Sequence, residues 1–133
     1  MSATNNDLAF LPAADLARRI RFGEITAREV TECFLARIGR HDDKLHAYIA
    51  LYEDEARLAA DAADMAIKAG QSVGPFHGVP VALKDIIELD GRVTTGGSKP
   101  WSDRVSTTTA TLAQRLISSG MIVLGKTHTV EFA

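Results

Sequence analysis

The sequence predicts an α/β protein, in which N-terminal helices precede the first strands and a crossover helix of a mixed α/β sheet. Three observations point to this class. Apolar residues recur at helical spacing through most of the chain before Gly70. Two nearly continuous apolar runs follow, at residues 79–89 and 121–125. A helical pattern at residues 107–120 separates them, and the resulting order of strand, loop, helix and strand is that of a βαβ-like crossover.

Helix start and stop signals near the N-terminus predict two successive helices. Pro12 suits the first turn of one helix, and Gly23 closes it. Thr26 and Glu29 then form a T-x-x-E capping box at the start of the second helix. The apolar stripe of this second helix consists of Val30, Cys33, Phe34 and Ile38. Because Cys33 lies on that stripe, we expect its thiol to be buried and unreactive.

A short strand and a third helix complete the first half of the chain. The run HAYIALY, residues 46–52, is apolar and aromatic, as is typical of a strand. The residues that then repeat at helical spacing are mostly small, which predicts close packing against another element. They are Ala56, Ala59, Ala60, Ala63 and Ile67. Gly70 ends this pattern, and residues 71–78 are a predicted loop.

Composition limits the function classes. The chain has 133 residues, of which 46% are hydrophobic and 24% charged, and these proportions are typical of one ordinary globular domain or part of one. A formal net charge of -2 argues against direct binding of nucleic acid or of an anionic membrane. The chain has one cysteine and lacks both a long apolar run and a secretory signal pattern. These features predict a cytoplasmic protein.

The run GMIVLGKT, residues 120–127, matches the phosphate-binding pattern G-x-x-x-x-G-K-[ST]. A working phosphate loop needs a strand before it and a helix after it. Here Gly120 ends a predicted helix and Met121 to Leu124 are strand residues, so the order is reversed. We therefore expect no nucleotide to bind at this motif.

Lys84 is the strongest candidate for chemistry. It follows five apolar residues in the run VPVALKD, at the end of a strand predicted to be covered on both faces. Strand alternation places Lys84 and Asp85 on opposite faces, so Asp85 cannot easily neutralise the ammonium. Burial lowers a lysine pKa by up to ~3–5 units and can turn the amine into a general base. The alternative is a lysine that extends into solvent at the strand end.

Other candidate sites are weaker. His41 and His46, with two aspartates between them, are metal-ligand types without the spacing of common sites, so a solvated helix-to-strand turn is expected there. His77 lies in a turn, and His128 follows the last strand. No Ser/His/Asp or Cys/His set can be assembled, and the sequence predicts neither a metal nor a cofactor.

Three blocks in order carry a family resemblance. The segments GPFHGVPVALKD, TTGGS and GMIVLGKTHTVEFA, together with the opening DLARRIRFGEITAREVTECFLARI, resemble the N-terminal part of the amidase signature family. The resemblance extends over residues 7–133. It implies that residues 1–133 are the N-terminal part of a single amidase signature domain, mainly helical over residues 1–70 and α/β over residues 71–133. The fold would then be an incomplete part of the amidase signature fold.

The resemblance also implies a chemistry. Family members hydrolyse amide bonds with a serine nucleophile, a second serine in a cis peptide, and a lysine that matches Lys84. The residues beside the substrate channel would be Phe132 and Ala133. Both family serines lie beyond Ala133, so none of the serines present is expected to be the nucleophile. The chain is therefore expected to be a fragment of a longer amidase or a truncated product, and inactive alone.

Alternatives of other classes stay open. One is a free-standing α/β module that binds a partner without catalysis, and another is a chain like the A subunit of an amidotransferase. The expected partners are a small-molecule amide substrate and either the missing C-terminal part or a second copy of the chain. Neither the substrate nor the oligomeric state follows from the sequence.

Overall fold

The computed structural model describes residues 8–133. Residues 1–7, which the predicted domain includes, lie outside this range. The helices are α2 (Ala13–Arg21), α3 (Ala27–Leu45), α4 (Glu53–Lys68), the 3-10 helix η1 (Lys99–Trp101) and α5 (Thr111–Ser118). The strands are β1 (Tyr48–Leu51), β2 (Pro80–Lys84) and β3 (Ile122–Thr127). The predicted mixed α/β class is confirmed.

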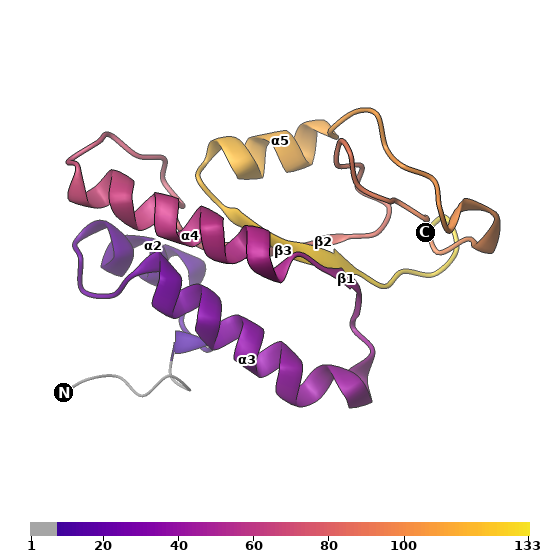
Figure 1. The fold of residues 1–133 in the computed structure, drawn as a ribbon, viewed down its shortest axis with the longest axis horizontal. Coiled ribbons are helices and arrows are strands. Elements are labelled where there is room, and N and C mark those ends of the chain that lie inside the picture. The colour runs from indigo at the N-terminus through magenta and orange to yellow at the C-terminus, as the bar shows by residue number, and fades with distance from the viewer. Residues whose placement is uncertain (1–7) are drawn as a thin grey trace.

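The three strands form one mixed sheet in the order β1-β3-β2. The central strand β3 pairs antiparallel with β1 and parallel with β2, and the chain passes from β2 to β3 through α5. Figure 1 shows α5 on the side of the strands opposite to α2 and α3. The predicted βαβ-like crossover is therefore present, with Lys84 facing Thr127 in the register of the parallel pair.

The apolar run at residues 79–89 does not form a strand over its whole length. β2 ends at Lys84, and the next residues turn, with the Ile87 amide donating to the Lys84 carbonyl over 2.9 Å. The strand ends here because its partner β3 also ends, at Thr127. The apolar residues beyond Lys84 therefore line a turn and do not extend the sheet.

Gly125 lets the central strand approach β1 closely. A Cβ atom at this position would lie 2.1 Å from the Ala50 carbonyl oxygen, much closer than any real contact. The pairing of β3 is irregular on both sides of this glycine, between Tyr48 and Ala50 in β1 and between Val81 and Ala82 in β2. Glycine in a strand is typical of such irregular, close contacts.

Helices α3 and α4 pack against each other, and α4 also contacts β3. The predicted capping box at Thr26 and Glu29 is present, with both of its hydrogen bonds. The carboxylate of Asp64 in α4 accepts hydrogen bonds from the amides of Ala27 and Arg28, at 2.7 and 3.0 Å. Since these amides belong to the first turn of α3, one carboxylate fixes the two helices together.

The core lies between these helices and the sheet. Its buried members include Ile20, Ala27, Val30, Cys33, Ala56, Ala60, Val79 and Leu124. The predicted burial of Cys33 is confirmed, and burial raises the pKa of its thiol. No helix within residues 8–133 is long and apolar enough to cross a membrane.

Candidate active site

Lys84 is the last residue of β2, and its side chain is exposed. Its neighbours Leu83 and Asp85 are each 1% exposed, so alternation turns them into the interior and Lys84 away from it. The sequence-based expectation of a buried Lys84 is thus wrong for residues 8–133, because no element in this range covers that face. The predicted separation of Lys84 from Asp85 is confirmed.

Asp85 is held by groups from two other segments. Its amide donates to the Thr127 carbonyl over 2.9 Å, and its carbonyl accepts from the Gly96 amide over 2.9 Å. Its carboxylate accepts the Thr95 amide at 3.1 Å and also the Thr95 hydroxyl. Asp85 therefore joins the ends of β2 and β3 to the loop at residues 94–98.

Lys126 is fully buried beside Asp85, on the neighbouring strand β3. Its amine donates to the Ile87 carbonyl at 2.7 Å and to the Thr94 hydroxyl at 2.8 Å, and it lies 3.6 Å from the Asp85 carboxylate. Burial lowers the pKa of Lys126, and the charge of Asp85 opposes that shift. A lysine enclosed in this way cannot reach a phosphate.

The nucleotide-binding interpretation of residues 120–127 is also excluded by element order. Helix α5 precedes the motif and β3 occupies most of it. The predicted order of helix and then strand at this motif is confirmed, and the Lys126 side chain is buried in the interior of the fold.

The loop at residues 94–98 connects to the C-terminal segment as well. The Gly96 carbonyl accepts the Phe132 amide at 2.7 Å. The Ser98 hydroxyl donates to the Glu131 carboxylate at 2.7 Å. Two segments that are far apart in the sequence are thus fixed against each other next to the end of β2.

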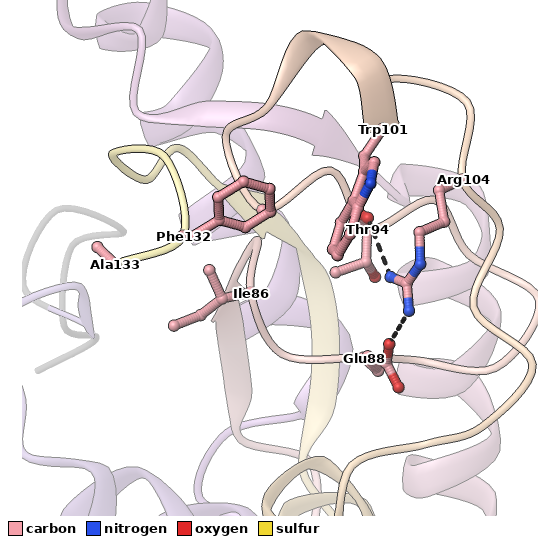
Figure 2. Close-up of a pocket in the computed structure, with 8 residues that line it drawn as sticks. Ile86, Glu88, Thr94, Trp101, Arg104, Phe132 and Ala133 are labelled. Atoms are coloured by element: carbon pink, nitrogen blue, oxygen red, sulfur yellow. Dashed lines mark hydrogen bonds and ion pairs between the residues drawn. The ribbon is translucent and has the colours of Figure 1, made fainter.

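A pocket of about 270 Å³ opens at this junction. It is lined by Ile86, Glu88, Thr94, Gly96, Trp101, Arg104, Phe132 and Ala133. Figure 2 shows Trp101 between the Phe132 ring and the Arg104 guanidinium, with Ile86 directed toward the pocket from below. The pocket thus has an apolar side and a charged side.

The aromatic wall has a defined geometry. The rings of Trp101 and Phe132 meet edge to face, with centroids 4.9 Å apart and planes at 75°. Such pairs stabilise by about 0.5–1.5 kcal/mol beyond their buried area. Phe132 has a φ of 51°, which is unusual for an aromatic residue, and its ring lies over Gly96, where a Cβ atom would approach it to 3.2 Å.

The charged wall consists of Arg104 and Glu88, which form an ion pair. Arg104 also lies 4.7 Å from the centre of the Trp101 ring. Hydrogen bonds from Arg104 and, next, from Thr108 hold the pKa of Glu88 below its ordinary value. Glu88 is therefore an ionised wall residue, not a proton donor.

Of the three site residues predicted from the resemblance, two line the pocket and Lys84 does not. Phe132 and Ala133 line the pocket, and Lys84 precedes the lining residue Ile86 by two positions. Sequence reasoning missed the contribution of Asp85 and Lys126. The available signal was a carboxylate within one apolar run and a lysine at the end of the other, a pattern that predicts mutual pairing.

The histidines have structural contacts. His41 lies near the end of α3 and His46 caps that helix with a left-handed φ of 48°, so the predicted helix-to-strand turn is confirmed. The His77 ring contacts the Ala63 carbonyl at 3.0 Å. Among residues 8–133 there is no group of three or more His, Cys, Asp or Glu side chains able to hold a metal ion.

Known proteins resemble this chain in both sequence and fold. The Amidase family model matches residues 29–133. The chain is 41% identical, over its whole length, to the A subunit of glutamyl-tRNA(Gln) amidotransferase from Streptomyces avermitilis and covers 26% of that protein. It is 41% identical to the protein of the same name from Lachnospira eligens, with 91% of this chain and 25% of that protein covered.

Solved structures agree. The native peptide amidase of Stenotrophomonas maltophilia superposes with a TM-score of 0.85 at 35% identity, covering 94% of this chain and 26% of that one. A bacterial aryl acylamidase of the amidase signature family gives a TM-score of 0.86 at 28% identity, covering 92% and 26%. The chain thus spans about a quarter of the length of the relatives it matches. On the family match, the sequence identity and the shared fold, the chain belongs to the amidase signature family.

Proposed function

We propose that this chain supplies the lysine of an amidase that hydrolyses carbon–nitrogen amide bonds through a Ser–cisSer–Lys triad. Lys84 is the general base. Its neutral amine takes a proton through the bridging serine while the nucleophilic serine attacks the amide carbonyl, and it later returns a proton to the leaving amine. Both serines and the groups that stabilise the oxyanion come from parts of the protein beyond Ala133.

The observation that carries this proposal is the position of Lys84. It lies at the carboxyl end of a parallel strand, where open α/β sheets place their ligands. It also directly precedes the segment whose Ile86 lines the pocket. Ser98 and Ser106 are buried and hydrogen-bonded to Glu131 and Thr94, respectively. These contacts support the proposal that the nucleophile is another serine, outside residues 8–133.

The mechanism places a requirement on the rest of the protein. A lysine with an ordinary pKa of about 10.4 is protonated at pH 7 and cannot begin the cycle. Since Lys84 is exposed within residues 8–133, the segments that carry the serines must also cover its amine. That cover would remove water from the amine and favour its neutral form.

The pocket lined by Ile86 is the proposed substrate site, with Phe132 and Ala133 in its wall. The Trp101 and Phe132 rings suit an apolar group on a small amide substrate. The name of the aryl acylamidase refers to an amide with an aromatic group. The proposal includes no cofactor, no direct contact with nucleic acid or membrane, and a cytoplasmic location.

The test is Lys84→Gln in the longest protein that the gene encodes. Hydrolysis of a peptide amide and of an aryl acylamide should fall by at least about 10²–10⁴-fold, because general acid–base groups contribute that much. Lys68→Gln, which alters an exposed lysine at the end of α4, should leave hydrolysis unchanged. Near wild-type hydrolysis by a folded Lys84→Gln protein would remove Lys84 from the mechanism.

A second function is favoured by the names of the two relatives described above, which are amidotransferase A subunits. In that case the protein would take nitrogen from a primary carboxamide and would work with partner subunits. Ammonia release from a primary carboxamide, without cleavage of aryl acylamides, would favour the amidotransferase. Cleavage of both by the purified protein alone would favour a free amidase, and a folded protein that cleaves neither would favour the binding module.

A further inference from the structure

We propose that Asp85 is a positioning residue for the Lys84 amine: through Thr95 and Lys126 it fixes the end of β2 to the pocket loop at residues 94–98. The inference rests on the proposed role of Lys84 as general base. It concerns a buried carboxylate that the triad itself does not use.

The backbone of Asp85 is held from both sides. Its amide extends the pairing with β3 by donating to the Thr127 carbonyl at 2.9 Å, and its carbonyl accepts the Gly96 amide at 2.9 Å. Leu83, on the other side of Lys84, is buried and belongs to the sheet. The Cα atom of Lys84 is therefore fixed by its two neighbours.

The carboxylate of Asp85 adds the side-chain link. It is 1% exposed and accepts both the amide and the hydroxyl of Thr95. The Thr95 hydroxyl in turn accepts the Gly97 amide at 3.0 Å. The buried Lys126 amine, 3.6 Å away, balances the charge and donates to Thr94, the residue before Thr95. One carboxylate thus organises successive residues of the loop.

Lys84 itself has no comparable support. Its side chain is exposed and makes no hydrogen bond or ion pair with residues 8–133. The direction in which the amine leaves the sheet is therefore set by the backbone at residues 83–85. Misplacing a reacting group by about 1 Å can cost 10²-fold in rate, so the anchor at Asp85 has a direct bearing on turnover.

The same anchor also fixes the pocket. Gly96, which donates to Asp85 through its amide, accepts the Phe132 amide through its carbonyl at 2.7 Å. Phe132 and Gly96 both line the pocket. Asp85 therefore fixes the position of Lys84 relative to the pocket wall that contains Gly96 and Phe132.

The experiment compares three variants of the longest protein that the gene encodes. Asp85→Ala removes the acceptor of both Thr95 donors, whereas Asp85→Asn keeps an oxygen for them. Asp64→Ala is the matched control, because Asp64 also accepts two amides of another segment but does so at the start of α3, away from β2. Kinetics on an aryl acylamide separate kcat from KM, and hydrogen exchange reports the amides of residues 94–97 without requiring activity.

For Asp85→Ala we expect kcat to fall about 10²-fold, with KM changed by less than about threefold, because the bond from Gly96 to the backbone carbonyl of residue 85 does not depend on the side chain. Asp85→Asn should recover at least about tenfold of that loss, as partial restoration of the hydrogen bonds predicts. Exchange at residues 94–97 should become faster in Asp85→Ala alone. Asp64→Ala should lose thermal stability but keep its kcat.

A folded Asp85→Ala protein with wild-type kcat and unchanged exchange at residues 94–97 would overturn the inference. An equal loss of kcat in Asp64→Ala would also overturn it, because general destabilisation would then explain the effect. If the proposed function itself is wrong, a folded Lys84→Gln protein will remain active, whatever the effect of the Asp85 substitutions.

Discussion

The ammonium of Lys126 is completely enclosed, and its charge is balanced by Asp85 at 3.6 Å. Removing two charges from water costs several kcal/mol per ion, and their mutual attraction offsets this cost only with good additional hydrogen bonds. Here the Ile87 carbonyl and the Thr94 hydroxyl provide two of them. The pair therefore depends on both partners.

Substitution of Lys126 by methionine should leave the Asp85 carboxylate buried without its countercharge. We expect the free energy of unfolding to fall by about 3–5 kcal/mol, as for other broken buried pairs. Chemical denaturation of the full-length protein measures this change, with the exposed Lys68→Met as control. An unchanged midpoint would contradict the dependence of the pair on both partners.

Among the elements, α3 and α4 are joined by an ion-pair network on their exposed side. Glu32 in α3 accepts from Arg57 in α4 at 2.8 Å and from Arg28 at 3.0 Å. Arg28 also reaches Asp61 at 2.6 Å. Hydrogen bonding from Arg57, partly opposed by burial, lowers the pKa of Glu32.

The lowered pKa gives a pH dependence with a definite sign. A carboxyl whose folded pKa lies below its unfolded value of about 4.3 stabilises the fold above that value and loses the effect as pH falls through the folded pKa. Since Glu32 is 41% exposed, Glu32→Gln should cost less than about 1 kcal/mol at pH 7. Thermal unfolding should show the difference shrink as pH falls below about 4.3, the unfolded pKa. A larger difference at pH 3 than at pH 7 would contradict the sign.

The elements that the sequence predicted well are those with local signals. The capping box at Thr26, the end of the first helix near Gly23 and the helix-to-strand order at Gly120 depend on residues close in sequence, and each is present. The predicted strand end at Lys84 is also present, although the apolar composition continues to Leu89, beyond the point where the pairing partner has stopped.

Parts of the candidate site could not be predicted because they depend on register and coverage. Leu83 faces Lys126 and Lys84 faces Thr127 only through the pairing of two strands that lie far apart in the sequence. The Asp85–Lys126 pair follows from that register. The exposure of Lys84 follows from which face the helices cover, and strand alternation alone assigns residues to faces without saying which face is buried.

At the scale of the whole molecule, the described residues leave much apolar surface exposed. Large exposed side chains include Phe10, Phe22, Leu58, Met65 and Val130. Within residues 8–133, β2 pairs only with β3, so its other edge presents unpaired backbone groups. Open edges and apolar surface favour association.

A polypeptide of residues 1–133 alone should therefore self-associate, or bind a hydrophobic dye, and should not hydrolyse amides. Under the proposed mechanism it carries the lysine without the nucleophilic serine, and a lone lysine cannot perform acyl transfer. Light scattering and an amidase assay test both statements. A compact monomer with a cooperative thermal transition would support a free-standing module, and hydrolysis retained after Lys84→Ala would show that the chemistry lies elsewhere.

The central position of β3 has a consequence for synthesis on the ribosome. β1 and β2 do not pair with each other, and the strand that separates them is the last of the three to be translated. The helices α3 and α4 can form while the chain is still growing, since their contacts are close in sequence. The sheet cannot form until Thr127 has left the exit tunnel. β1 and β2 therefore remain unpaired and accessible to chaperones while the ribosome translates the connection from Asp85 to β3.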